Sequence, residues 1–479
     1  MAAPSYPPGF GAWLPPPTQV VDAELRAGKL ECTDITDCFD CASNKTWTGK
    51  PCRWCPLPND NHCHAEGSID NKCSKDQQIT NPAMCPKAPA HRAPVVILPG
   101  IVGSNVQATL DKPSIVQPLC TKKTSDWYYV WLESFEVAPD AVKCLFDNLK
   151  LVHEGGGKVT NQPGVTTRIA DYGGLGDIGC AMPKTAALCS ATTNWKQVTD
   201  LLLASGYTVG VDLFGAPFDW RYGPRTWVAR EFPQLKALIE KAYASANNTK
   251  VVLQSISLGG PYGHAFLTQF VDQAWKDKHI DSWVSLSSVW NGAGEVVQML
   301  TAGLAWDGIK WIPAAMFRDG VKNWPGMIFM LPHVYADPSN RTVDDVWVKT
   351  PSTTYKASQL HEMLLAAGFD DTAAIYETIK QYQTSHTQPG VKVYCWYGEG
   401  TPTTVEMNFA GSDLSKGGVP IMGDGDGTVH HSSLRVCEDW VGKGDYETIV
   451  KVWPNVTHTG FLTNGEAQQE ILKLLTTGG

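Results

Sequence analysis

The sequence has no run of about 18 or more uncharged apolar residues, so hydropathy predicts no transmembrane helix. Its first residues, Met1-Ala2-Ala3-Pro4, lack the basic and then apolar pattern of a secretory signal peptide. Charged residues make up only 18% of the chain, and the net charge of −9 argues against a nucleic-acid partner because a polyanion would be repelled. Apolar residues nevertheless fill 43% of the 479 positions, which is typical of a globular protein with a large core and an accessory module.

Cysteines and glycosylation motifs together indicate an oxidising compartment. The 14 cysteines are even in number, and four Asn-x-Thr sequons occur, at Asn44, Asn247, Asn340 and Asn455. A single sequon is weak evidence because such triplets arise by chance, but the cysteine pattern supports them. We therefore expect a glycosylated protein that is secreted or lumenal, in a lysosome, a vacuole or the secretory pathway.

The first part of the chain divides by composition into an arm, a cysteine-rich module and a linker. Residues 1–31 are rich in proline and have no periodicity, and residues 86–93 have the composition of a linker. Residues 32–85 hold eight cysteines but too few aliphatic side chains for a core, so disulfides worth about 2–4 kcal/mol each would stabilise them. Zinc is the alternative, because Cys38-x₂-Cys41 and Cys52-x₂-Cys55 are both CxxC pairs. We favour disulfides, which fit the same compartment as the sequons.

One segment of this module resembles a known small domain. The run Cys52-Arg53-Trp54-Cys55, with Cys38-x₂-Cys41 upstream, resembles a PSI domain, the small module of plexins, semaphorins and integrins. The resemblance implies a spacer, or a module that docks another protein or the rest of the chain. The spacing leaves the disulfide connectivity open.

Residues 94–479 have the pattern of an α/β domain. Short β-rich runs alternate with helical patterns along this part of the chain. The i, i+3, i+4, i+7 spacing of apolar residues from Leu235 to Tyr243 predicts a helix that faces a core. The runs predicted as strands are Val95–Leu98, Val251–Leu253, Trp283–Leu286, Val391–Trp396 and Ile449–Val452.

Ser257 lies between a predicted strand and a predicted helix, in the run Ser255-Ile256-Ser257-Leu258-Gly259. A nucleophile elbow places its serine in a strained turn that needs small residues two positions before and two after, and Ser255 and Gly259 satisfy that need. A helix that begins at such a turn directs its N-terminus at the site and favours a developing oxyanion. The pattern predicts Ser257 as a nucleophile, although an ordinary serine in a glycine-rich turn gives a similar sequence.

A serine nucleophile needs a histidine base and a carboxylate that orients it, and both follow in the chain order of this fold. The loop Gly423-Asp424-Gly425-Asp426-Gly427 offers two acids, and His458 follows the predicted strand at Ile449–Val452. A calcium loop is the alternative for the two acids, although the liganding pattern and glutamate of an EF-hand are missing. His430 and His431 compete with His458 but are expected to be a surface pair.

Several separated segments resemble the family of lecithin:cholesterol acyltransferase and lysosomal phospholipase A over roughly residues 94–476. The segments that carry this resemblance are Pro94–Ser104, Cys120–Cys144, Gly215–Arg221, Tyr394–Gly398 with Cys437, and Gly423–Val429. The family implies an α/β-hydrolase fold with lid or cap insertions. Two positions depart from the family pattern: Ile256 precedes the serine where histidine is usual, and Ile101 stands where the lysosomal enzyme has an acidic residue.

The resemblance assigns a role to individual residues. It implies Ser257 as nucleophile, Asp426 as the orienting acid with Asp424 as its support, and His458 as base. The residues it further implies are Ile101 and Leu258 as oxyanion-hole donors, Trp127, Tyr128, Tyr129 and Trp131 as lid or acyl-pocket residues, and Cys120–Cys144 and Cys395–Cys437 as disulfides. Cys180 and Cys189 are close enough in sequence for a small further bridge.

These observations predict an enzyme that needs no cofactor or metal. Ser257 would take an acyl chain from a phospholipid ester and pass it to a lipid alcohol, such as a sterol, or to water. Its partners would be a phospholipid membrane or lipoprotein surface, bound peripherally, and the lipid acyl acceptor. Two alternatives remain: a binding protein on an inactive hydrolase scaffold, and an esterase for soluble substrates.

Overall fold

A computed structural model describes two compact units of the chain, residues 1–86 and 87–479. The described residues are 32, 38–43, 45–46, 48–55, 62–69, 71, 73–75, 77–81, 92–131, 141–304, 313–336, 342–383 and 387–477. The predicted arm 1–31 and the sequon asparagines Asn44 and Asn340 lie outside them. Within these ranges, no helix combines the length and the apolar character needed to cross a bilayer.

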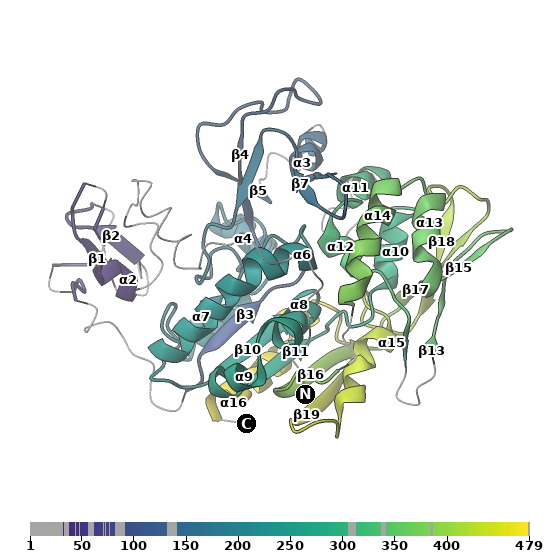
Figure 1. Cartoon of the computed structure of the whole chain (residues 1–479). Coiled ribbons are helices and arrows are strands. Elements are labelled where there is room, and N and C mark those ends of the chain that lie inside the picture. Colours follow the sequence, from purple (N-terminus) through teal and green to yellow (C-terminus); the bar gives the residue numbers. More distant parts are fainter. Residues whose placement is uncertain are drawn as a thin grey trace. The chain divides into compact units, whose positions relative to one another are not determined.

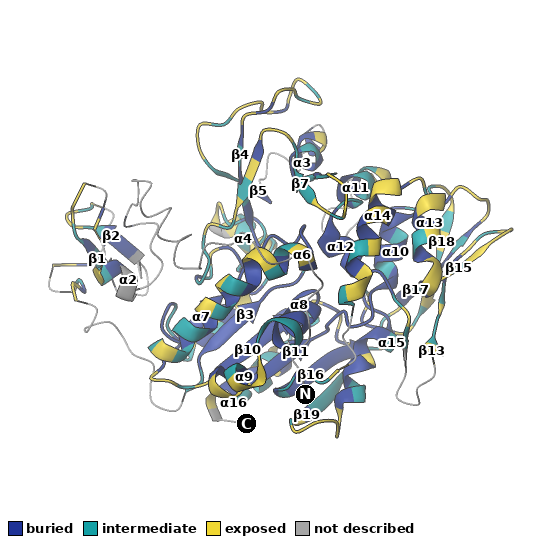
Figure 2. Cartoon of the chain, viewed as in Figure 1, coloured by how far each residue is buried: buried dark blue, intermediate teal, exposed yellow. Residues whose placement is uncertain are grey.

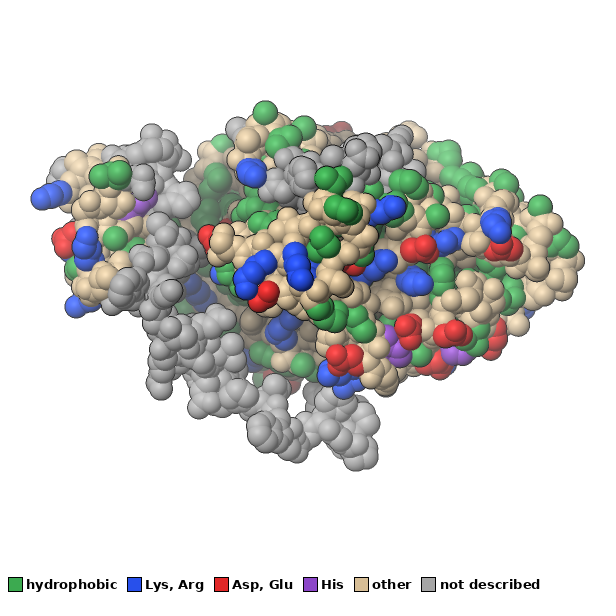
Figure 3. All heavy atoms as spheres, turned by 90° about the horizontal axis from the view of Figure 1, so that it is seen from above, with side chains coloured by type: hydrophobic (Ala, Val, Ile, Leu, Met, Phe, Trp, Pro, Cys, Tyr) green, Lys and Arg blue, Asp and Glu red, His purple; other side chains and the backbone are tan. Residues whose placement is uncertain are grey.

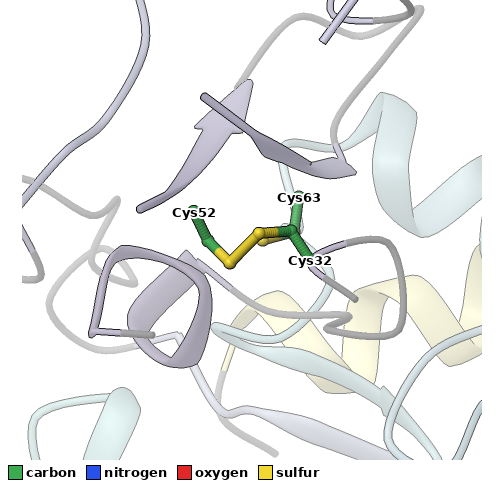
Figure 4. Close-up of side chains that lie close together, drawn as sticks. All are labelled: Cys32, Cys52 and Cys63. Carbon is green, nitrogen blue, oxygen red and sulfur yellow. A yellow bond between two sulfur atoms is a disulfide. The ribbon is translucent and has the colours of Figure 1, made fainter. Parts of the chain in front are cut away.

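The first unit is held together by disulfides around a small core. Strand β1 (Cys52–Cys55) pairs antiparallel with β2 (His62–Ala65), next to helix α2 (Cys38–Ser43), and Trp54 is buried between them. The disulfides described here join Cys32 to Cys52, Cys41 to Cys63 and Cys55 to Cys73. Figure 4 shows Cys32 bonded to Cys52 with Cys63 close by. These sulfurs are bonded in pairs and provide no thiolates for zinc, so the disulfide prediction is confirmed here.

The second unit is built on a six-stranded sheet in which every neighbouring pair is parallel (Figure 1). Its strands in spatial order are β19 (Thr448–Pro454), β16 (Lys392–Glu399), β11 (Ile280–Leu286), β10 (Val251–Ile256), β3 (Val95–Leu98) and β9 (Leu213–Gly215). The five strands predicted from sequence all belong to this sheet. Central strands are buried along their whole length (Figure 2), because helices cover both faces of a parallel sheet.

Helices on the two faces complete two hydrophobic cores. On one face α5 (Lys196–Ala204) and α16 (Gly465–Thr477) pack against side chains such as Val95 and Ile97. On the other face α7 (Phe232–Ser245) and α8 (Gly259–Ala265) pack against the alternate side chains, such as Val96 and Leu98. The helix predicted at 235–243 is the middle of α7, with Leu235, Leu238, Ile239 and Ala242 buried. Helix α9 (Gln273–His279) leads into β11.

Two insertions extend the sheet domain. The elements of the first are β4 (Val106–Leu110), β5 (Tyr128–Trp131) and β8 (Val165–Arg168) in one antiparallel sheet, then α3 (Val142–Leu149) and the hairpin of β6 (Leu151–His153) and β7 (Val159–Asn161). The elements of the second are α10 (Gly294–Leu300), α11 (Ala314–Val321), α12 (Pro325–Phe329), α13 (Leu360–Ala366), α14 (Asp370–Ile379) and the strands β14 (Val346–Lys349), β15 (Thr354–Lys356), β17 (Thr403–Phe409) and β18 (Gly418–Gly423). Shorter elements are α4 (Ala186–Ala191), α6 (Pro224–Thr226), β12 (Tyr335–Ala336), β13 (Thr342–Val343) and α15 (His431–Leu434).

A buried ion pair joins the first insertion to the sheet domain. Arg221 is fully buried, and its Nη2 donates to Asp219 Oδ2 at 2.6 Å. Its Nη1 donates to the carbonyl of Leu149 at the end of α3. Burial alone would raise the pKa of Asp219, but Arg221 outweighs burial and lowers that pKa. The two charges therefore depend on each other.

We expect Arg221→Met to lower the free energy of unfolding by about 3–5 kcal/mol, because Asp219 would be left as an unpaired buried charge. Chemical denaturation of the purified protein measures this change. Arg225→Met is the control, since Arg225 is exposed and donates only to the carbonyl of Gly156. Equal losses in the two variants would contradict a special role for the buried pair.

Candidate active site

Ser257 occupies the turn between β10 and α8 in a left-handed conformation. Its φ is +57°, a region that costs non-glycine residues free energy and persists mainly at functional sites. A Cβ on Gly259 would lie 2.4 Å from the carbonyl oxygen of Leu98, so the turn can form only with glycine at that position. The local geometry is therefore that of the elbow predicted from Ser255, Ser257 and Gly259.

The turn after β3 lies directly against this serine. A Cβ on Gly100 would lie 2.8 Å from the Cβ of Ser257, which shows how closely the two backbones approach. In the described part of the chain, no acceptor takes the backbone N–H of Ile101 or of Leu258. Both N–H groups are thus available to an oxyanion. The serine is 8% exposed, so only a small part of its surface is accessible to water.

His458 and Asp426 form a direct hydrogen-bonded pair. The distance between His458 Nδ1 and Asp426 Oδ2 is 2.8 Å, and the other carboxylate oxygen accepts the backbone N–H groups of Thr428 and Val429. Burial disfavours the charged imidazolium, but the Asp426 carboxylate outweighs burial and raises the pKa of His458 above its ordinary value. Such a hydrogen-bonded pair can act as a histidine base and its orienting acid.

The second acid of the loop has a different task. Asp424 Oδ1 accepts the backbone N–H groups of Gly400 and Gly425, each at 2.8 Å, and its side chain is half exposed. Asp424 therefore joins the acid loop to the end of β16. One oxygen of Asp426 contacts His458 and the other accepts backbone N–H groups, so the two acids of the loop make separate contacts.

The competing histidines lie in different environments. His431 is the surface residue of the pair, 31% exposed, with its ring nitrogens 3.6 Å from Glu399 and 3.7 Å from Asp424. His430 is instead buried against Trp347, and burial lowers its pKa to about 3. The expectation that both are surface residues is wrong for His430, because the chain turns inward at Val429 to form the acid loop.

Strand direction brings these groups to one edge of the sheet. Strands β10, β11, β16 and β19 are parallel neighbours, so the loops that follow them all leave from the same edge. Ser257 follows β10, His458 follows β19, and Asp426 lies against Gly398 of β16. The order and direction of the strands therefore bring Ser257, Asp426 and His458 to one edge although they are far apart in sequence.

Of the aromatic residues predicted for a lid, Tyr128, Tyr129 and Trp131 lie on β5 of the first insertion, and Trp127 directly precedes this strand. Trp127 to Tyr129 are partly exposed, and Trp127 stacks on the guanidinium of Arg168. Trp131 is buried; its ring packs edge-on against Trp220, and its Nε1 donates to the carbonyl of Val102 at 3.2 Å. Trp131 therefore braces the turn next to Ser257. The position of Trp131 in the sequence, four residues after Trp127, does not predict its contact with Val102.

The remaining predicted residues are disulfide cysteines and sequon asparagines. Disulfides join Cys120 to Cys144, Cys180 to Cys189 and Cys395 to Cys437. The sequon residues Asn247 and Asn455 are both exposed, in left-handed conformations with φ of +54° and +59°. Glycosylation at these asparagines stays a prediction.

Asp426→Asn should lower the pKa of His458, because burial then acts on the imidazole without the opposing carboxylate. NMR titration of ¹³C-labelled histidines measures the change, with His458→Ala to assign the signal. A raised pKa makes the ion pair stabilising below the unfolded value of 6.5, and this contribution is lost as pH rises through the folded pKa. An unchanged titration in Asp426→Asn would show that the pair is not formed in solution.

Most of the chain is similar to known proteins. Residues 127–388 and 376–475 match the family model described as lecithin:cholesterol acyltransferase. A human relative, "Lysosomal phospholipase A and acyltransferase", is 30% identical over 81% of this chain and 92% of its own length. A chicken relative, "Phosphatidylcholine-sterol acyltransferase", is 29% identical over 79% of this chain and 89% of its own length, and a mouse protein of that name is 29% identical over 76% and 81%. The chain belongs to the lecithin:cholesterol acyltransferase family.

Proposed function

We propose that this protein is a phospholipid acyltransferase and phospholipase A in which Ser257, Asp426 and His458 form the catalytic triad. The observation that carries the proposal is the hydrogen bond between His458 and Asp426 at the sheet edge where Ser257 holds its left-handed turn. Membership of the family, whose relatives are phospholipase A and acyltransferase enzymes by name, supports the same chemistry.

In the first step Ser257 attacks the carbonyl carbon of a phospholipid ester. His458 Nε2 removes the hydroxyl proton, and the Asp426 carboxylate stabilises the imidazolium that forms. The carbonyl oxygen becomes an oxyanion and accepts the N–H groups of Ile101 and Leu258. The intermediate then collapses, His458 returns its proton to the leaving oxygen, and a lysophospholipid departs from the acyl-enzyme.

In the second step an acceptor hydroxyl attacks the acyl-enzyme with His458 again as base. Water gives a free fatty acid, and a lipid alcohol such as a sterol gives an acyl ester. Both outcomes use one triad, so the ratio between them depends on how well the site admits the acceptor and excludes water. The base must be neutral to act, so the raised pKa of His458 sets the acidic limit of activity.

The surface and the cysteines support an extracytosolic enzyme that works on lipid aggregates. Val116 and Leu119 are more than half exposed just before the loop closed by Cys120 and Cys144, and apolar side chains lie among charged ones on the face seen in Figure 3. Such a surface suits peripheral contact with a phospholipid membrane or a lipoprotein. The disulfides and the lysosomal relative favour a secreted or lumenal location, with the PSI-like module as a spacer or docking unit.

Ser257→Ala should abolish lysophospholipid formation and labelling by a fluorophosphonate probe, because the acyl-enzyme cannot form. Mass spectrometry of lipid products and gel fluorescence measure the two effects. Ser255→Ala is the matched control, since it removes only the hydrogen bond from Trp283 and keeps a small residue at the elbow. Absence of labelling in the unmodified protein would favour the binding-protein alternative.

Adding a lipid alcohol to phospholipid liposomes should divert acyl groups from free fatty acid to an acyl ester, because both acceptors compete for one acyl-enzyme. Mass spectrometry should find one lysophospholipid for each fatty acid or ester formed, with and without sterol. Ester formed without lysophospholipid would contradict the acyl-enzyme route. Equal rates on dispersed and liposomal esters would favour the soluble-substrate esterase.

A further inference from the structure

We propose that Trp131 is a positioning residue for the oxyanion hole, and that through it the first insertion holds the oxyanion turn, residues 100–103, in its reactive shape. The proposal rests on the proposed roles of Ser257 as nucleophile and of the Ile101 N–H as an oxyanion donor. Trp131 ends β5, which lies beside β4 in the first insertion (Figure 1). Its indole N–H donates to the carbonyl of Val102, 29 residues away in sequence. The fold therefore connects the insertion directly to the turn.

Two hydrogen bonds lead from this indole to the Ile101 N–H. The first joins Trp131 Nε1 to the Val102 carbonyl at 3.2 Å. The second joins the N–H of Gly103 to the carbonyl of Gly100 at 3.1 Å. The Val102 carbonyl and the Gly103 N–H belong to one peptide unit. The Gly100 carbonyl and the Ile101 N–H belong to another. We call this series of bonds from Trp131 to Ile101 the indole relay.

Each peptide unit of the indole relay transmits direction and polarity. A trans peptide is planar, and its C=O and N–H point in opposite directions, so a hydrogen bond that fixes the carbonyl also fixes the N–H. Hydrogen bonds in such a series polarise one another. The Ile101 N–H at the end of the relay therefore has a fixed direction and a larger partial positive charge where an oxyanion forms.

The backbone of the oxyanion turn needs support from outside the turn. Val102 has a φ of +54°, which is an outlier for a β-branched residue. Such a conformation persists only where the surrounding structure holds it. The turn is also tight, since a Cβ on Gly103 would lie 3.0 Å from the carbonyl oxygen of Gly100. The bond from Trp131 supplies support at the strained residue itself.

Trp131 is in turn fixed by its own packing. Its side chain is buried, and its ring meets Trp220 edge-on with the centroids 5.3 Å apart. Trp220 is fully buried and donates its indole N–H to the carbonyl of Ser104 at 2.9 Å. The Ser104 hydroxyl accepts the backbone N–H of Phe218. The chain is thus held just after the oxyanion turn, and the indole of Trp131 has little freedom to move away from Val102.

The position of Trp131 separates its role from that of a lipid-contacting residue. Tyr128 and Tyr129 on the same strand are partly exposed, whereas Trp131 is buried against the oxyanion turn. A residue that only contacted lipid would affect turnover of aggregated substrates alone. A residue that orients an oxyanion donor affects the chemical step for every ester, soluble or aggregated.

Trp131→Phe in the full chain tests the indole relay, because it keeps a buried ring and removes the N–H. Turnover of a soluble p-nitrophenyl ester and of phosphatidylcholine liposomes, analysed separately for kcat and KM, measures the effect. The rate of Ser257 labelling by a fluorophosphonate is the second readout, since negative charge also develops on an oxygen in that reaction. Trp324→Phe is the matched control: Trp324 is also buried, and its indole N–H donates to the carbonyl of Leu149, outside the relay.

We expect kcat and the labelling rate to fall about tenfold in Trp131→Phe, less than the loss of about 10²–10³-fold for removal of an oxyanion donor itself. The fall should be similar for the soluble ester and for liposomes, with KM unchanged. Trp324→Phe should keep both rates. Unchanged rates in Trp131→Phe, equal losses in the two variants, or a loss confined to liposomes would each overturn the relay.

Chemical denaturation of both variants separates lost activity from lost folding. If Trp131→Phe does not fold, β-(3-benzothienyl)alanine incorporated at position 131 keeps the size of the indole and replaces its N–H with sulfur. The same fall in both rates is expected for that protein. Absence of labelling in the unmodified protein would refute the proposed function, whereas equal labelling rates with and without the N–H at position 131 would refute the relay alone.

Discussion

The close approach of two backbone segments at the carboxyl edge of the parallel sheet is the constraint on which the site depends. The elbow packs onto the end of β3 at Gly259, and the turn after β3 packs onto Ser257 at Gly100. These contacts place a strained serine beside two N–H groups that have no other acceptor in the described chain. Helices on both faces hold the sheet rigid, so the strain at Ser257 is retained by the surrounding packing.

Asp424 and Asp426 belong to one loop and have the same side chain, but their different surroundings give them different contacts. Asp426 is buried and gives one oxygen to His458 and the other to backbone N–H groups, so it can orient an imidazole. Asp424 is half exposed and holds the loop to the end of β16. His430 and His431 are divided in the same way, since one is buried against Trp347 and the other faces two surface carboxylates. Position relative to the sheet edge decides each role.

Much of the architecture could be predicted from sequence because local patterns carry it. Buried strands such as β3 and β10 are continuous apolar runs, and the small residues around Ser257 mark a tight turn. Contacts between residues far apart in the chain are not marked by any local sequence pattern. Trp131 resembles its aromatic neighbours in sequence, yet it alone among them is buried next to Val102.

The disulfide between Cys395 and Cys437 has a consequence for how the second insertion can move. Cys395 lies within β16 at the centre of the domain, and the bond closes 42 residues that include β17, β18 and Asp426. If this part of the cap moves, the disulfide keeps its two ends joined to each other at β16. The disulfide thereby limits how far β17, β18 and the acid loop can move away from β16.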